Sequence, residues 1–197
     1  MVSGVPLAGA TLSIAAGIAL AAYPLLVYST MGRFGPVGAA ALLAVVCIAR
    51  LALVAMRGAG SIAGNGIAFV CIGGALLAAA AFWFESRSAV LYYPVLVNAV
   101  LLAVFAASLW RPPTIIERIA RLREPDLPPA AVVYTRRVTI VWAVFFALNG
   151  AAALYTTVAT SLETWTLYNG FVAYLLIGAL FIGELATRSA FRARLKS

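Results

Sequence analysis

The chain of 197 residues is 64% hydrophobic and 10% charged, with a mean hydropathy of +1.04 and a net charge of +8. A soluble domain carries roughly 25% charged residues, so this composition excludes a water-soluble globular fold and predicts a protein whose solvent is lipid. The basic residues lie beside apolar runs, where the positive-inside rule places them, and no recognition motif accompanies them, so we expect no nucleic-acid partner.

Six apolar stretches are long enough to cross a bilayer, whose roughly 30 Å hydrocarbon core needs about 20 residues of helix. They are residues 6–28, 36–56, 66–84, 89–110, 138–158 and 165–185. In the first of them, Pro24 and many small residues allow a kink or a partly interfacial position. The pattern predicts an all-α fold: a polytopic transmembrane helix bundle of six spans that forms a single domain over residues 1–197.

The longest polar segment, residues 111–137, fixes the orientation of these spans. Twelve of the 14 basic residues fall on its side of the membrane, and only Arg33 and Arg87 fall on the other. Short loops rich in Arg and Lys stay in the cytoplasm. We therefore predict that this loop and both chain termini are cytoplasmic.

Within this loop, residues 114–123 have the pattern of a short amphipathic helix, which begins with a capping-box pair, Thr114 and Glu117. The apolar face carries Ile115, Ile116, Ile119 and Leu122, and the basic face carries Arg118 and Arg121. Either the helix lies on the anionic inner leaflet, or it packs on the ends of the protein's own spans. In the first case the lipid-headgroup contacts are Arg118, Arg121 and Arg123.

Polar side chains inside spans are informative because they are costly in lipid and usually face the bundle interior. Asn98 and Asn149 lie near the same depth in consecutive antiparallel spans, at about 1.5 Å of rise per residue. We predict that the two amides approach each other or share a polar partner. Their role is either a hydrogen bond that ties the helices together or the lining of a substrate path. Asn169, near the start of the last span, is a third candidate intramembrane polar residue.

Two charged residues also fall within spans. Arg50 lies one to two turns from the inner end of the second span, and Glu184 lies at a similar depth in the sixth. A contact between them would neutralise both charges. Glu184 and Arg188 also have the i,i+4 spacing of a helical ion pair. We expect these residues to form a structural ion pair.

The common catalytic and ligand-binding motifs are missing from the sequence. It contains no His, the commonest general base and metal ligand, and no phosphate loop, GxSxG, HExxH or CxxC pattern. Cys47 and Cys71 lie inside apolar runs, where a free Cys behaves as a small hydrophobe. We therefore predict no catalytic residue, no metal and no cofactor.

The C-terminal half has a distinctive order of motifs. A basic, Pro-interrupted loop leads to the run VWAVFFALNGAAALY at residues 141–155, then to a Trp-containing turn at residues 163–165 and to a last span that begins with LYNG at residues 167–170. This half resembles the intracellular septation protein A family of bacterial inner-membrane proteins. It resembles still more a sister group often encoded near fatty-acid-like or aryl-polyene synthesis genes. The resemblance implies a multi-pass inner-membrane protein with a role in envelope synthesis through protein contacts, and it carries over no catalytic residue.

These observations lead to two main hypotheses about function. The first is a non-enzymatic accessory or scaffold protein in envelope or lipid-linked biosynthesis, whose partners are membrane lipids and other membrane proteins. The second is a small carrier or flippase for a lipid or acyl product, with Asn98, Asn149 and Arg50 lining its path. A lipid or ligand held between the spans would favour the carrier, and a closed bundle would favour the scaffold. A third hypothesis, an integral-membrane enzyme subunit, is disfavoured by the absence of His and of clustered carboxylates.

Overall fold

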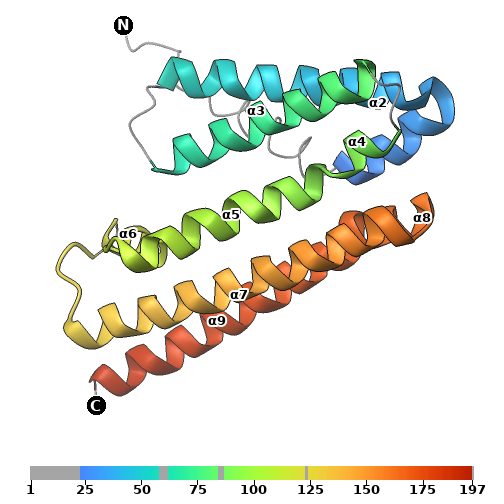
Figure 1. The fold of residues 1–197 in the computed structure, drawn as a ribbon. Helices are drawn as coiled ribbons and strands as arrows, with labels where there is room; N and C mark the ends of the chain where they lie inside the picture. The colour runs from blue at the N-terminus through green and yellow to red at the C-terminus, as the bar shows by residue number, and fades with distance from the viewer. Residues whose placement is uncertain (1–22, 58–61, 84–86, 123, 197) are drawn as a thin grey trace, which may run out of the picture.

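The computed structural model describes residues 23–57, 62–83, 87–122 and 124–196 of the chain. These residues are mostly helical, and no strand occurs among them. The helices are α2 (Tyr23–Arg57), α3 (Ile62–Trp83), α4 (Arg87–Leu91), α5 (Tyr93–Trp110), α6 (Ile115–Arg121), α7 (Pro129–Ala159), α8 (Leu162–Leu167), the π-helix η1 (Tyr168–Val172) and α9 (Ala173–Lys196). The described part of the chain is therefore all-α, as predicted (Figure 1).

Three helical segments are long and apolar enough to cross a membrane: Ala89–Trp110, Pro129–Ala159 and Leu162–Ser189. They cover the fourth, fifth and sixth predicted spans, but the helix Pro129–Ala159 begins within the predicted loop, so residues 129–137 are helical and not part of a loop. Two shorter apolar helices, Val37–Ala49 and Val70–Ala80, lie within α2 and α3. The lengths and composition are those of a helical membrane protein. Most of the first predicted span, residues 6–22, lies outside the described residues.

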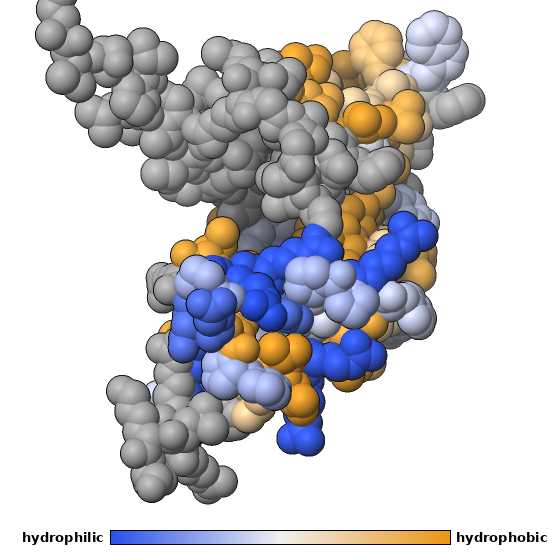
Figure 2. Space-filling model, turned by 90° about the vertical axis from the view of Figure 1, so that its left-hand side faces the viewer, coloured by the Kyte–Doolittle hydropathy of each residue, from blue (hydrophilic) through white to orange (hydrophobic). Residues whose placement is uncertain are grey.

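The long helices run back and forth between two ends of the bundle (Figure 1). α5 leads through α6 into α7 at one end, and α7 leads through α8 and η1 into α9 at the other. Residues 111–128, which connect α5 to α7, and the end of α9 consequently lie at the same end, which we call the basic end. Figure 2 looks onto this end, where hydrophilic side chains gather beside exposed hydrophobic ones. The most extensive helix pairings are α2 with α3 and α5 with α7, and contacts between α3 and α5 join the two pairs.

Helix α2 bends at Gly35, which has φ 65° and ψ −166°. Pro36 follows it, and a residue before proline is disfavoured in the α conformation. Glycine reaches a positive φ without the steric cost that a side chain would add. The bend falls between the first and second predicted spans. Residues before it lie towards α4, α8 and η1, and residues after it pack along α3 (Figure 1).

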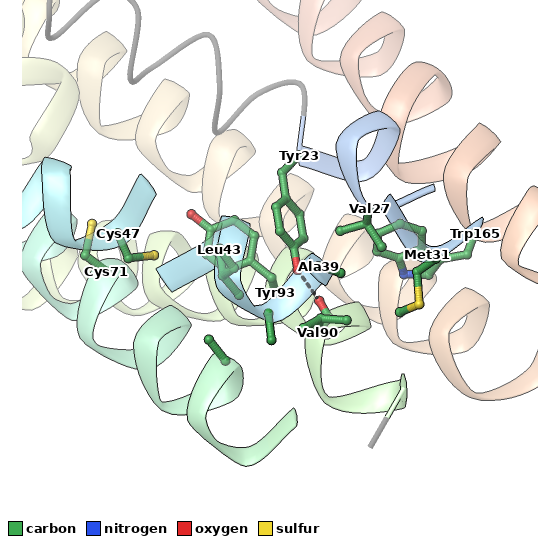
Figure 3. Close-up of a cluster of buried hydrophobic side chains, with 12 residues drawn as sticks. Tyr23, Val27, Met31, Ala39, Leu43, Cys47, Cys71, Val90, Tyr93 and Trp165 are labelled. Carbon is green, nitrogen blue, oxygen red and sulfur yellow. Dashed lines mark hydrogen bonds between the residues drawn. The ribbon is translucent and has the colours of Figure 1, made fainter. Parts of the chain in front are cut away.

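The apolar run from α4 to α5 is interrupted at Tyr92. Pro94 has no backbone N–H, so it cannot bond the carbonyl of Val90 one turn earlier. That carbonyl instead accepts a hydrogen bond from the hydroxyl of Tyr23 at 2.7 Å, and the Tyr23 ring packs on Tyr93 with 4.6 Å between the ring centroids. The break in the helix thereby ties α4 to α2 (Figure 3).

The main hydrophobic core lies where α2, α3, α4, the start of α5 and α8 meet. It contains Tyr23, Val27, Met31, Ala39, Ala40, Leu43, Cys47, Cys71, Ala78, Val90, Tyr93 and Trp165 (Figure 3). Cys47 and Cys71 are both buried and free, so they fill the core as small apolar side chains, as the sequence predicted.

Candidate functional site

Two of the predicted polar residues meet between α5 and α7. Asn149 Nδ2 donates a hydrogen bond to Asn98 Oδ1 at 3.0 Å, and both side chains are buried. Asn98 Nδ2 in turn donates to the carbonyl of Pro94 at 2.8 Å. A Cβ on Gly150 would lie 3.1 Å from Asn98 Cβ, so this glycine lets the two helices approach closely beside the amides. The predicted contact between the two amides is confirmed.

A tyrosine that sequence reasoning did not single out extends this contact to a third helix. The hydroxyl of Tyr168, in η1, donates to Asn149 Oδ1 at 2.9 Å. The sequence did contain a signal, because a tyrosine just inside an apolar span needs a hydrogen-bond partner when it turns inwards. We call the hydrogen-bonded series from Tyr168 through Asn149 and Asn98 to the carbonyl of Pro94 the amide chain.

Asn169 lies beside the amide chain, near the start of the π-helix. Its Nδ2 donates to Thr156 Oγ1 at 3.1 Å and to the carbonyl of Trp165 at 2.9 Å, which uses both of its N–H groups. Its Oδ1 accepts no hydrogen bond from any residue that the structure describes, although the side chain is only 5% exposed. A buried acceptor without a donor is a place where a ligand or a water gains a hydrogen bond. Such π-helical turns are frequent at functional sites.

The three asparagines line one partly open cavity of about 260 Å³. Its aromatic walls come from Tyr23, Tyr93, Phe146 and Tyr174. Asn98 and Asn149 each keep one N–H without a partner among the described residues, in addition to the free oxygen of Asn169. The lining of the cavity therefore includes two donors and one acceptor that no described residue satisfies. The chemistry that this arrangement supports is hydrogen bonding and orientation of a small polar group.

A larger space of about 650 Å³ lies between α7 and α9 near the basic end, and Glu184 lines it. The hydroxyl of Tyr134 donates to the backbone carbonyl of Glu184 at 3.4 Å, which links the two helices. The predicted ion pair between Glu184 and Arg188 is wrong, because no ion pair joins these two described side chains. The side chain of Arg50 lies outside the described residues, so its contact with Glu184 is not tested directly, but α2 packs along α3 and lies across the bundle from α9 (Figure 1).

Helix α6 packs against α7, which is the second of the two predicted arrangements. Thr114 Oγ1 accepts a hydrogen bond from the backbone N–H of Glu117 at 3.4 Å, and this is one half of the predicted capping box. The carboxylate of Glu117 does not complete the box. It accepts hydrogen bonds from Nε and Nη2 of Arg121 at 2.9 and 2.8 Å. This pairing keeps the buried carboxylate neutralised.

The faces of α6 differ from the predicted ones. Thr114, Glu117 and Ala120 are buried, whereas Ile119 is 55% and Leu122 84% exposed. The internal ion pair lets a polar face turn towards α7, and part of the apolar face points away from the protein. The same helix can therefore pack on α7 with one face and contact the bilayer with its exposed apolar edge.

The arginines of this loop also bind its own carbonyls. Arg118 Nε donates to the carbonyl of Pro113 at 2.7 Å, and Arg121 Nη1 donates to that of Pro125 at 2.7 Å. Arg123 lies outside the described residues. A guanidinium has five N–H groups, so Arg118 and Arg121 retain donors beyond these bonds, and their contact with lipid headgroups stays a prediction.

No family model, no curated protein and no solved structure matches the chain. What the site can do therefore follows from its own residues.

Proposed function

We propose that the protein is a non-enzymatic accessory or scaffold protein of the bacterial inner membrane that serves envelope or lipid-linked biosynthesis. The observation that carries this proposal is the uncovered apolar surface of the last span. On α9, Leu175, Phe181 and Ile182 are 57%, 53% and 67% exposed. A span that packs loosely on its own bundle offers its surface to lipid and to the spans of another membrane protein.

The amide chain supports a scaffold for a second reason. It joins α5, α7 and η1 through two buried asparagines and the partly buried Tyr168, which are bonded to one another. Hydrogen bonds of this kind hold helices together in a medium where apolar burial contributes little. The hydrogen bonds between these polar side chains thereby hold α5, α7 and η1 against one another, and the outer apolar surface of the helices remains available to partner proteins.

The proposed topology has six spans, with both termini and the loop of residues 111–137 in the cytoplasm. It is supported by the basic asymmetry of the sequence and by the shared location of this loop and the end of α9 (Figure 1). In this orientation α6 lies on the cytoplasmic side, where the free donors of Arg118 and Arg121 are available to anionic headgroups of the inner leaflet. A role in the envelope is what the resemblance to the septation protein A family implies.

Site-specific photo-crosslinking in living cells tests the scaffold proposal. A photoreactive amino acid at Ile182 is expected to capture a membrane protein, identifiable by mass spectrometry. The same probe at Ile48 on α2, which is 61% exposed, is the matched control and should not capture that protein. Lipid adducts alone at both positions would contradict the scaffold.

The cavity lined by three asparagines favours one alternative, a small carrier or flippase for a lipid or acyl product. A carrier requires an internal polar site, and the free Oδ1 of Asn169 provides one. In proteoliposomes, the carrier would move a fluorescent phospholipid between leaflets faster than protein-free vesicles do, and Asn169→Leu would abolish the difference. Equal rates with and without the protein would exclude movement of that lipid.

A further inference from the structure

The groove between α7 and α9 is amphiphilic along its length. Its polar lining residues are Tyr134, Arg137, Glu184 and Thr187, and its apolar ones include Val138, Val141, Trp142, Ala179 and Leu180. The polar residues lie towards the basic end, and Trp142 lies deepest along α7, about 12 Å from the level of Tyr134 at 1.5 Å per residue. The volume of about 650 Å³ falls within the range of roughly 300–1,000 Å³ of small-molecule sites. This shape suits a ligand with a charged head and an apolar body.

The two charged residues of the groove define what kind of head it accepts. Arg137 comes from α7 and Glu184 from α9, and within the described part of the chain neither forms an ion pair. Charges at the level of a membrane are costly unless they are paired. A guanidinium binds phosphate through two parallel N–H bonds, and a carboxylate accepts hydrogen bonds from an ammonium group.

We propose that this groove binds one phospholipid whose headgroup carries both a phosphate and a primary ammonium, as in phosphatidylethanolamine. The phosphate lies on Arg137, the ammonium lies on Glu184, and one acyl chain follows the apolar wall towards Trp142. A phosphatidylglycerol headgroup has no ammonium and would leave Glu184 unpaired. A phosphatidylcholine headgroup has a quaternary ammonium with no N–H to donate, so it satisfies Glu184 less well.

Glycines on α9 allow the occupancy of the groove to be tested without disturbing the fold. Gly183 lines the groove, and a Cβ built there meets no atom within 4 Å. A Cβ at Gly178 likewise meets nothing within 4 Å, but Gly178 does not line the groove. Gly183→Leu therefore places a side chain where the acyl chain lies, and Gly178→Leu is the matched control on the same helix.

The test uses the full-length protein in detergent. The protein is equilibrated with equal amounts of phosphatidylethanolamine, phosphatidylcholine and phosphatidylglycerol, and native mass spectrometry measures which lipid remains bound. We expect phosphatidylethanolamine to be retained about fivefold or more over each of the others, the ratio expected from one additional charged contact. Arg137→Gln should lower retention of all three lipids. Glu184→Gln should remove the preference for phosphatidylethanolamine over phosphatidylcholine.

Matched charge controls are Glu163, in α8 at the end opposite the basic end (Figure 1), and Arg33, just before the bend of α2; both are exposed and neither lines the groove. Arg33→Gln and Glu163→Gln should bind lipid as the unchanged protein does. Gly183→Leu should lose the bound lipid and Gly178→Leu should keep it. Equal retention of the three lipids, an unchanged preference in Glu184→Gln, or full retention in Gly183→Leu would each overturn the proposal.

Discussion

The indole Nε1 of Trp165 donates a hydrogen bond to the backbone carbonyl of Leu91 at 3.1 Å, although 74 residues separate the two. The carbonyl lies at the break between α4 and α5, and Trp165 lies in α8. Thr157 Oγ1, on α7, shares its single proton between the same carbonyl at 3.2 Å and that of Ala153 at 2.8 Å. A carbonyl at the helix break is thus bonded by donors from two other helices, which holds the bundle together at the end opposite the basic end.

Trp165→Phe is expected to lower the free energy of unfolding by about 1–2 kcal/mol. The change removes the indole N–H, which bonds both the Leu91 carbonyl and Thr157 Oγ1, and leaves a small cavity, since Trp165 is only 1% exposed and phenylalanine is smaller. Thr157 still serves the carbonyl, which keeps the loss moderate. Thermal unfolding in detergent measures it, with Trp110→Phe as the control because Trp110 is 80% exposed. An equal melting temperature for both variants would contradict the role of this bond.

Gly74→Ala and Gly178→Ala should change stability in opposite directions. A Cβ on Gly74 would lie 2.7 Å from Cys47 Sγ and 3.0 Å from Tyr93 Cε2, so the core must shift, at a cost of about 1–3 kcal/mol. A Cβ on Gly178 meets nothing within 4 Å, and alanine favours the helix over glycine by up to about 1 kcal/mol. Unfolding in mixed micelles compares the two variants. Destabilisation by both, or by neither, would show that the packing around Gly74 differs from that described.

The sequence predicted the contact of Asn98 with Asn149 because depth in a span follows from counting residues, and a buried amide needs a partner. It did not predict that Tyr168 and Asn169 would both turn to polar partners. The π-helix places them, since its wider turn shifts the faces of the last span relative to a regular α-helix. No periodicity in residues 167–172 marks that turn.

Other features depend on distant parts of the chain. Pro94 predicts that the carbonyl of Val90 has no helical N–H partner. It does not predict that the hydroxyl of Tyr23 bonds this carbonyl instead. In α6 the predicted faces were partly wrong because the bond between Glu117 and Arg121 makes burial of a carboxylate acceptable. A hydropathy pattern counts Glu117 as polar and therefore predicts that it is exposed, because the pattern does not include the ion pair with Arg121.

The proposed topology predicts where reporters fused to the chain will be found. Fusions at Ser197 and within residues 124–129 should both be cytoplasmic, because the positive-inside rule assigns to the cytoplasm the side that would hold twelve of the 14 basic residues in this topology. A reporter inserted at Ser161, in the turn between α7 and α8, should be periplasmic and serves as the opposite control. A periplasmic signal from Ser197 or from residues 124–129 would contradict the six-span arrangement.

A peptide of residues 114–123 should gain helix on anionic vesicles and much less on neutral ones. Each Arg near the surface favours an anionic bilayer by about 1 kcal/mol, and the exposed Ile119 and Leu122 provide an apolar edge. Circular dichroism measures the helix content, and a peptide with Arg118→Gln and Arg121→Gln is the control. Equal helix content on both kinds of vesicle would leave packing against α7 as the only role of this segment.

The amide chain predicts a graded response to substitution. Asn98→Leu removes one interhelical hydrogen bond, and Asn149→Leu removes two, those with Asn98 and Tyr168. Interhelical bonds of this kind contribute about 0.6 kcal/mol each on average, so Asn149→Leu should be the more destabilising and Tyr168→Phe should cost about as much as Asn98→Leu.

A double-mutant cycle isolates the bond itself. The combined Asn98→Leu, Asn149→Leu variant should be less destabilised than the sum of the single variants, by about the contribution of their shared bond. If the amides instead serve transport, each single substitution should abolish activity in a complementation assay while stability and expression stay normal. Additive losses without any effect on activity would contradict both roles, because the 3.0 Å contact between Asn149 and Asn98 would then contribute neither to the packing of α5 on α7 nor to a substrate path.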